Sequence, residues 1–103
     1  MCHEKNHKIN PHYHNFQSRI VKKTNEVLII KKGLLRIDFF SNNKKYLYSK
    51  LLFKGDIILL VSGGHGFEML KKTEMIEVKQ GPYTKKSDKK LIKPTKTIKY
   101  KIK

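Results

Sequence analysis

The sequence predicts a single all-β domain, and three observations carry this prediction. The chain has 103 residues, a length that accommodates one domain and not two. Turn signals such as Lys32-Gly33 and Gly55-Asp56 recur at about the 8–12-residue spacing typical of small sandwiches and barrels. No window of helical length shows an apolar stripe with a period of about 3.6 residues.

The segments between these turns show the alternation expected of strands. In Leu34–Phe40, Leu35 and Ile37 alternate with charged residues, which places apolar and polar side chains on opposite faces. Small all-β domains with evenly spaced strands close up to protect their edges, as barrels or jelly rolls. The six expected strands are Val27–Lys31, Leu34–Phe40, Tyr46–Phe53, Ile57–Val61, Phe67–Leu70 and Met75–Gln80.

The apolar residues of the last segment predict how it is oriented. If Ile76 and Val78 face the core, the side chain of Gln80 also points inward. Glu77 and Lys79 then point outward, where they can pair at the surface. We favour this orientation because it buries the two aliphatic side chains.

Composition excludes several classes of protein. Leu, Ile, Val and Phe together make up 30 of the 103 residues, above the roughly one-fifth typical of disordered chains. The longest apolar run, Ile57–Val61, is far too short to span a bilayer, and Met1–Asn10 has no apolar signal segment. Cys2 is the only cysteine, so no intrachain disulfide can form. We therefore expect a cytoplasmic protein without membrane association.

The formal net charge of +16 suggests a polyanion as partner, but its composition and position argue against nucleic acid. Of the 24 basic residues 22 are Lys, whereas nucleic-acid readers rely on the bidentate fork of Arg. Residues 26–83 carry only +4, and residues 84–103 carry +8. Thr97–Lys103 alternates apolar residues with Lys, and we favour an edge strand or a disordered tail over a polyanion-binding tail. A non-catalytic basic module that binds nucleic acid or another polyanion is the alternative function.

The sequence His12-Tyr13-His14 has a spacing that suits metal binding. On a strand, residues two apart point to the same face. Two neutral imidazoles on one face can hold a divalent transition metal, and a carboxylate and a further His from neighbouring strands would complete the site. Two histidines with this spacing and no further ligand are more often a feature of a solvated surface.

Two other elements contain residues that could complete such a site. Glu26 opens the apolar run Glu26–Gly33. In Gly63-Gly64-His65-Gly66-Phe67-Glu68, glycines permit the positive φ of a tight turn that presents His65 inward. If these residues do not meet the histidine pair in the folded chain, Glu26 is an ordinary surface carboxylate and His65 is an incidental turn residue.

Together these elements resemble the two motifs of the cupin superfamily. The spacing from Glu26 to Gly33 fits the first cupin motif. Gly55–His65 follows the order of the second motif, from Gly through an apolar strand to a Gly-containing turn and a His. The stretch Gly55–Tyr83 is also similar to small bacterial single-domain cupins. The chain departs from the first motif in one respect: eleven residues separate His14 from Glu26, whereas the family places the His pair only a few residues before the Glu.

The resemblance implies a cupin-type jelly-roll β-barrel, that is, a double-stranded β-helix, over residues 12–83. Residues 1–11 would form an N-terminal arm, and residues 84–103 a Lys-rich tail or edge strand. The resemblance also implies four ligands for Fe, Mn, Ni, Cu or Zn, and three residues that line the ligand site. The metal ligands are His12, His14, Glu26 and His65, and the ligand-binding residues are Glu68, Gln80 and Tyr83.

The implied function is the binding of a small polar or anionic molecule, such as a sugar, a sugar phosphate or an organic acid. The resemblance leaves open whether the protein senses this molecule or acts on it as a metal-dependent isomerase, epimerase or oxygenase. No Gly-rich loop precedes an expected helix, so no nucleotide cofactor is expected. Small cupins often form homodimers, and Lys99–Lys103 is a candidate for pairing across such an interface.

Overall fold

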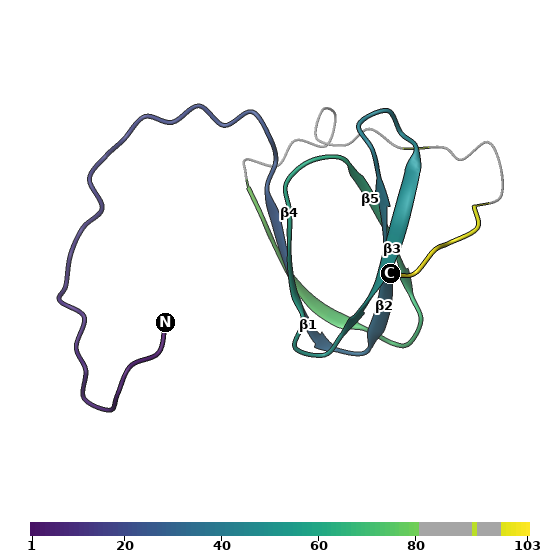
Figure 1. Cartoon of the computed structure of the whole chain (residues 1–103). Helices are drawn as coiled ribbons and strands as arrows, with labels where there is room; N and C mark the ends of the chain where they lie inside the picture. The colour runs from purple at the N-terminus through teal and green to yellow at the C-terminus, as the bar shows by residue number, and fades with distance from the viewer. Residues whose placement is uncertain (81–91, 93–97) are drawn as a thin grey trace.

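The computed structural model describes residues 1–80, 92 and 98–103, and within them it contains six strands and no helix, which confirms the all-β class (Figure 1). Tyr83 and most of the predicted tail lie outside the described residues. Where the chain is described, it forms no helix long and apolar enough to cross a membrane. The strands are β1 (Glu26–Lys32), β2 (Leu34–Phe40), β3 (Tyr46–Phe53), β4 (Ile57–Leu60), β5 (Gly64–Met69) and β6 (Glu74–Lys79).

The strands form two antiparallel three-stranded sheets, one of order β4-β1-β6 and one of order β3-β2-β5 (Figure 1). Gly33 joins β1 to β2, the central strands of the two sheets. Its φ is 99°, and a Cβ at this position would collide with the backbone carbonyl of Lys72, so only glycine fits. The described strands thus form two sheets and not a closed barrel, and the jelly-roll topology stays a prediction.

The hydrophobic core lies between the two sheets. Each central strand contributes alternate residues, as the period-two pattern predicts, and β3 and β4 add one residue each. Burial of one such side chain contributes roughly 1.5–3 kcal/mol to stability. The buried apolar residues are Leu28, Ile30, Leu35, Ile37, Leu52 and Leu60.

The orientation predicted for β6 is wrong. Met75 packs against the core, whereas Ile76 and Val78 are exposed on the outer face of the sheet. The reason is the register with β1, which pairs these two residues with positions on the outer face of that strand. Glu77 and Lys79 therefore share the face of Met75, which is turned toward the other sheet.

β5 begins earlier than predicted, at Gly64 and not at Phe67. The glycine-rich run predicts a turn, but only Gly63 has a positive φ, of 79°. Gly64 belongs to the strand, and a Cβ on it would lie 2.6 Å from Cδ1 of Ile92 and 3.2 Å from Cβ of Phe40. Close packing therefore explains the second glycine of this run, and turn geometry explains the first.

Residues 98–103 lie along the outer edge of β3. The backbone N–H of Ser49 donates to the carbonyl of Lys101 at 2.7 Å, and the N–H of Lys103 donates to the carbonyl of Ser49 at 2.9 Å. These bonds form a parallel bridge between Ser49 and Ile102. The segment thus protects an edge of its own sheet, as an edge strand does, while Thr97 lies outside the described residues.

Candidate functional site

Glu26 and His65 come together from the two sheets. Glu26 begins β1 on the row that continues into the core at Leu28, and His65 on β5 is opposite Phe39, which packs against the core. The Nε2 atom of His65 lies 3.4 Å from Oε2 of Glu26. Their side chains are 30% and 12% exposed, so the pair lies at the margin of the core.

The groups around this pair combine charge with apolar surface. In the pairings of β1, Glu26 is opposite Leu60 on one side and Lys79 on the other. The ring centroid of Phe67 lies 5.4 Å from that of His65. A carboxylate and an imidazole therefore meet at one margin of the core between the sheets, beside the strand position of Lys79. We call this region the Glu26–His65 end.

His12 and His14 are not part of the Glu26–His65 end. They lie in residues 1–20, an arm that extends away from both sheets and is longer than the predicted arm of residues 1–11 (Figure 1). Both side chains are exposed, their ring centroids lie 5.3 Å apart, and Nδ1 of His12 is 2.8 Å from the carbonyl of Asn10. The arm forms no strand, so the expectation that the two imidazoles share one face of a strand does not apply.

The described residues do not fit the four-ligand metal centre that the resemblance implies. In residues 1–80, 92 and 98–103, no group of three or more His, Cys, Asp or Glu side chains is placed to hold a metal ion. Glu26 and His65 offer one carboxylate and one imidazole, whereas protein zinc sites typically have three or four protein ligands. The same two groups can donate and accept hydrogen bonds to a polar organic molecule.

The residues expected to line the ligand site lie in different places. Glu68 is on the opposite face of β5 from His65, and its Oε2 lies 2.8 Å from Nη1 of Arg36. Gln80 ties the end of β6 to the residue before β1, because its Oε1 accepts from the N–H of Asn25 at 3.4 Å and its own N–H donates to the carbonyl of Asn25. Gln80 thus lies near the Glu26–His65 end, Glu68 does not, and Tyr83 is outside the described residues.

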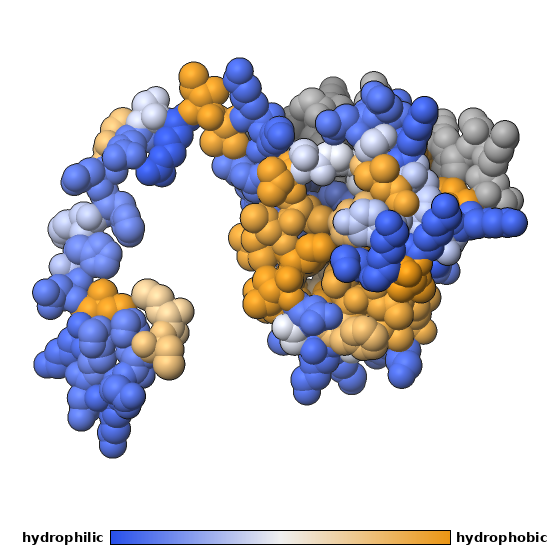
Figure 2. All heavy atoms as spheres, in the orientation of Figure 1, coloured by the Kyte–Doolittle hydropathy of each residue, from blue (hydrophilic) through white to orange (hydrophobic). Residues whose placement is uncertain are grey.

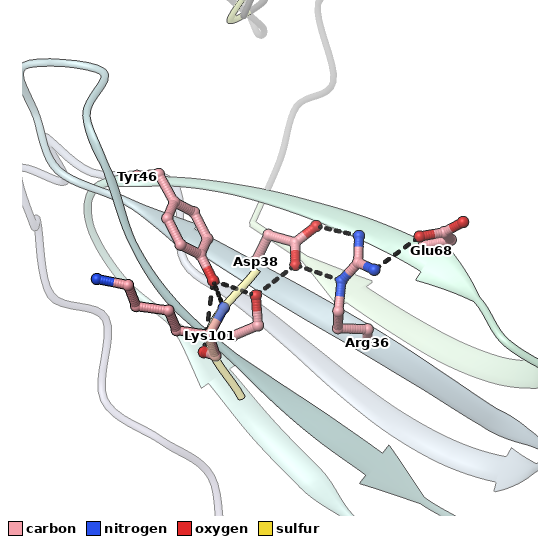
Figure 3. A network of polar contacts seen from close by, with 6 residues as sticks. Arg36, Asp38, Tyr46, Glu68 and Lys101 are labelled. Carbon is pink, nitrogen blue, oxygen red and sulfur yellow. Dashed lines mark hydrogen bonds and ion pairs between the residues drawn. The ribbon is translucent and has the colours of Figure 1, made fainter. Parts of the chain in front are cut away.

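A polar network on the outer face of the β3-β2-β5 sheet is absent from the sequence predictions (Figure 3). Asp38 accepts two hydrogen bonds from Arg36, at 2.7 and 3.1 Å, and one from the hydroxyl of Ser49, at 2.6 Å. The hydroxyls of Ser49 and Tyr46 are 2.7 Å apart, and the N–H of Lys101 donates to the Tyr46 hydroxyl at 2.7 Å. We call these residues the Asp38 network. Arg36 and Asp38 alternate with core residues, a pattern typical of an exposed strand face. The pattern therefore gives no sign that these two side chains are buried.

The end of the chain covers the Asp38 network. The guanidinium of Arg36 lies 3.6 Å from the ring centroid of Tyr100, and Asp38 and Ser49 are 6% and 0% exposed. The hydrogen bonds to Asp38 raise the pKa of Arg36 above its ordinary value, and the negative charges of Asp38 and Glu68 also raise it. Every buried side-chain nitrogen and oxygen of the described residues has a hydrogen-bond partner, so the network stabilises this face.

Comparison with known proteins finds no family model, no curated protein and no solved structure that matches this chain. The fold and the site alone therefore define the class: an all-β protein of two antiparallel sheets, with a carboxylate–imidazole pair at one end of the space between them.

Proposed function

We propose that this protein binds a small polar or anionic molecule at the Glu26–His65 end, in the manner of a cupin. The observation that carries the proposal is the 3.4 Å approach of His65 Nε2 to Glu26 Oε2 from facing sheets. The closure of the two sheets into a jelly roll, with binding inside it, is part of the same proposal. Ligand sites of this kind combine apolar walls with a few polar groups that orient the ligand.

The chemistry of the residues favours a ligand that carries both hydroxyl and acidic groups. The Glu26 carboxylate accepts hydrogen bonds from hydroxyls, and the imidazole of His65 either donates or accepts. Lys79, which is opposite Glu26 in the β1–β6 pairing, supplies positive charge for a phosphate or a second carboxylate. Sugars, sugar phosphates and organic acids meet these requirements. A residue that orients such a molecule could also move a proton on it, which would make the protein an enzyme.

Calorimetric titration of the full chain with a hexose, a hexose phosphate and citrate tests this proposal. We expect binding of at least one probe, and a loss of about 10-fold or more in affinity, about 1.4 kcal/mol, for Glu26→Gln and for His65→Ala. Glu68→Gln is the matched control, because this carboxylate lies on the same strand as His65 and on the opposite face. It should bind the probe as the unaltered chain does.

Two outcomes would contradict the proposal. One is binding that Glu26→Gln and His65→Ala leave unchanged while both variants keep the thermal midpoint of the unaltered chain. The other is a stoichiometric metal that elemental analysis finds in the unaltered chain and that is lost both in His65→Ala and in the double variant His12→Ala/His14→Ala. That result would contradict a site for an organic molecule and would favour the four-ligand metal centre.

A further inference from the structure

The arm of residues 1–20 concentrates the side chains that bind transition metals. Five of the six His and Cys residues of the chain lie between positions 2 and 14. Short tracts rich in His and Cys typically bind metal ions. All of residues 1–20 are exposed, and Figure 2 shows the beginning of the chain as a largely hydrophilic group apart from the sheets, so packing in the core does not explain these residues. They are Cys2, His3, His7, His12 and His14.

A turn brings two of these imidazoles together. The backbone N–H of His7 donates to the carbonyl of Glu4 at 3.2 Å, and Asn6 has a φ of 70°, in the left-handed region that Asn tolerates. The rings of His3 and His7 are parallel to within 3°, and their centroids lie 4.1 Å apart. Two nitrogens bound to one tetrahedral zinc ion lie roughly 3.3 Å apart, because zinc–nitrogen distances are about 2.0–2.1 Å. Rotation of the two exposed rings can therefore aim their nitrogens at one ion.

The spacing of these two histidines is one that zinc enzymes use. His3-Glu4-Lys5-Asn6-His7 has the order H-E-x-x-H, in which two His bind zinc from one face of a helix. Residues 1–20 form a turn here and no helix, so the similarity covers the two ligands and not the Glu, which acts as a base in those enzymes. The turn places the two rings side by side, as a helix does for residues four apart.

His12 and Cys2 provide the remaining ligands. Nδ1 of His12 lies 2.8 Å from the carbonyl of Asn10, which can only accept a hydrogen bond, so Nδ1 carries the proton and Nε2 the lone pair. Metal-bound His residues typically have this arrangement, in which a carbonyl or carboxylate holds the other ring N–H. Cys2 is an exposed free cysteine, and its thiolate is a soft ligand that suits zinc.

We propose that the arm binds one zinc ion through Cys2, His3, His7 and His12, independently of the Glu26–His65 end. Three nitrogens and one sulfur suit the tetrahedral coordination of zinc. In the described residues, no three of these side chains already surround one point, and His3 with His7 forms the part of the site that is in place. The ion gathers the other two ligands and orders the arm around itself, as metals do in small domains that fold on binding.

The charge of the chain does not oppose a cation at this place. Residues 1–14 contain two Lys and one Glu, so they carry only +1 of the net charge of +16. The arm extends away from the sheets, and physiological salt largely screens charges that are more than about 8–10 Å away. The thiolate form of Cys2 lowers the local charge to zero before the ion is counted.

Titration of the full chain with Zn²⁺ against a chromogenic chelator tests the proposal, at slightly alkaline pH and with a phosphine that keeps Cys2 reduced. We expect one zinc ion per chain, with a dissociation constant on the order of 1 μM or lower. His3→Ala and His7→Ala should each raise this constant about 10-fold or more, since loss of even an outer-shell partner of a ligand costs about 10–100-fold. His65→Ala, which removes an imidazole on β5, is the matched control and should leave it unchanged.

Cobalt(II) in place of zinc identifies the thiolate ligand. A thiolate bound to cobalt produces a sulfur-to-cobalt charge-transfer absorption that imidazole ligands alone do not produce. Cys2→Ser should abolish this absorption. The substituted side chains of the arm are all exposed, so the variants should keep the thermal midpoint of the unaltered chain, and a loss of binding then reports the loss of a ligand.

A full chain that takes up no zinc overturns the proposal. Zinc binding that stays unchanged in both His3→Ala and His7→Ala also overturns it, because the turn is then not the site. Zinc that is lost in His65→Ala would lie between the sheets and not in the arm. A cobalt spectrum that Cys2→Ser leaves unchanged contradicts the proposed set of four ligands.

Discussion

The outer faces of the two sheets differ in the chemistry that covers them. On the β3-β2-β5 sheet, charged and hydroxyl side chains form the Asp38 network, and Tyr100 and the backbone of Lys101 lie over it. On the β4-β1-β6 sheet, six aliphatic side chains form two rows, and the four on the outer strands are exposed. The inward faces do not differ in this way, since both supply aliphatic residues to one core.

This difference shows what each kind of face requires. Buried polar groups are tolerated when every donor and acceptor is satisfied, and the chain achieves this for the described residues with its own last segment. Among the described residues, no segment covers the apolar outer face of the β4-β1-β6 sheet in this way. Three experiments with five substitutions test this comparison, and they are ordered by the largest effect expected in each.

Asp38→Ala should have the largest effect, because it removes the main partner of the largely buried Arg36 charge and an acceptor for the Ser49 hydroxyl. We expect the free energy of unfolding to fall by about 3–5 kcal/mol. Urea denaturation monitored by circular dichroism measures this change. Glu68→Ala removes a partner of Arg36 that is largely exposed, and it should cost less than about 1 kcal/mol. Equal losses in the two variants would contradict the role assigned to the Asp38 network.

Ile37→Ala and Ile76→Ala compare a core position with a position on the outer face of the β4-β1-β6 sheet. Ile37 is fully buried between the sheets, so its truncation should reduce the free energy of unfolding by about 2–5 kcal/mol. Ile76 is about half exposed, and its truncation should cost less than about 1 kcal/mol. The same denaturation experiment measures both. A larger loss for Ile76→Ala than for Ile37→Ala would support the orientation of β6 predicted from the sequence.

Tyr100→Ala should cost about 1 kcal/mol, because it removes the stacking of Arg36 on the ring, and this is a smaller effect than those expected for Asp38→Ala and Ile37→Ala. The pKa of Arg36 is raised in the folded state, so the charged form contributes stability that is fully present below the unfolded-state pKa. That contribution disappears only when the pH rises through the folded-state pKa, in strongly alkaline solution. The loss measured for Tyr100→Ala should therefore be the same at about pH 6 and pH 9, and a difference between them would contradict this interpretation.

The strands were more predictable than the directions in which their side chains point. β2 and β3 have the predicted bounds, because turn residues flank them and period-two alternation fills them. β6 was located within one residue but oriented wrongly, because Met75, Ile76 and Val78 make both of its faces partly apolar. Local alternation cannot choose between two such faces, and the pairing with β1 decides.

The site was predictable to the extent that its residues lie on strands. Glu26 and His65 were predicted from motif spacing, and the sheets bring them together. The placement of His12 and His14 depended on a strand that the arm does not form. The Asp38 network could not be predicted, because Asp38 and Ser49 are buried by a segment that follows them in the chain by more than 50 residues.

The sequence by itself determined the all-β class, the approximate strand bounds and the alternation that builds the core. These properties depend on neighbouring residues and on the geometry of one strand. The tertiary structure alone decided which face of β6 is buried, which predicted site residues meet, and that Arg36 and Asp38 are covered. These outcomes depend on strand register and on contacts between distant segments, which local residue patterns do not encode.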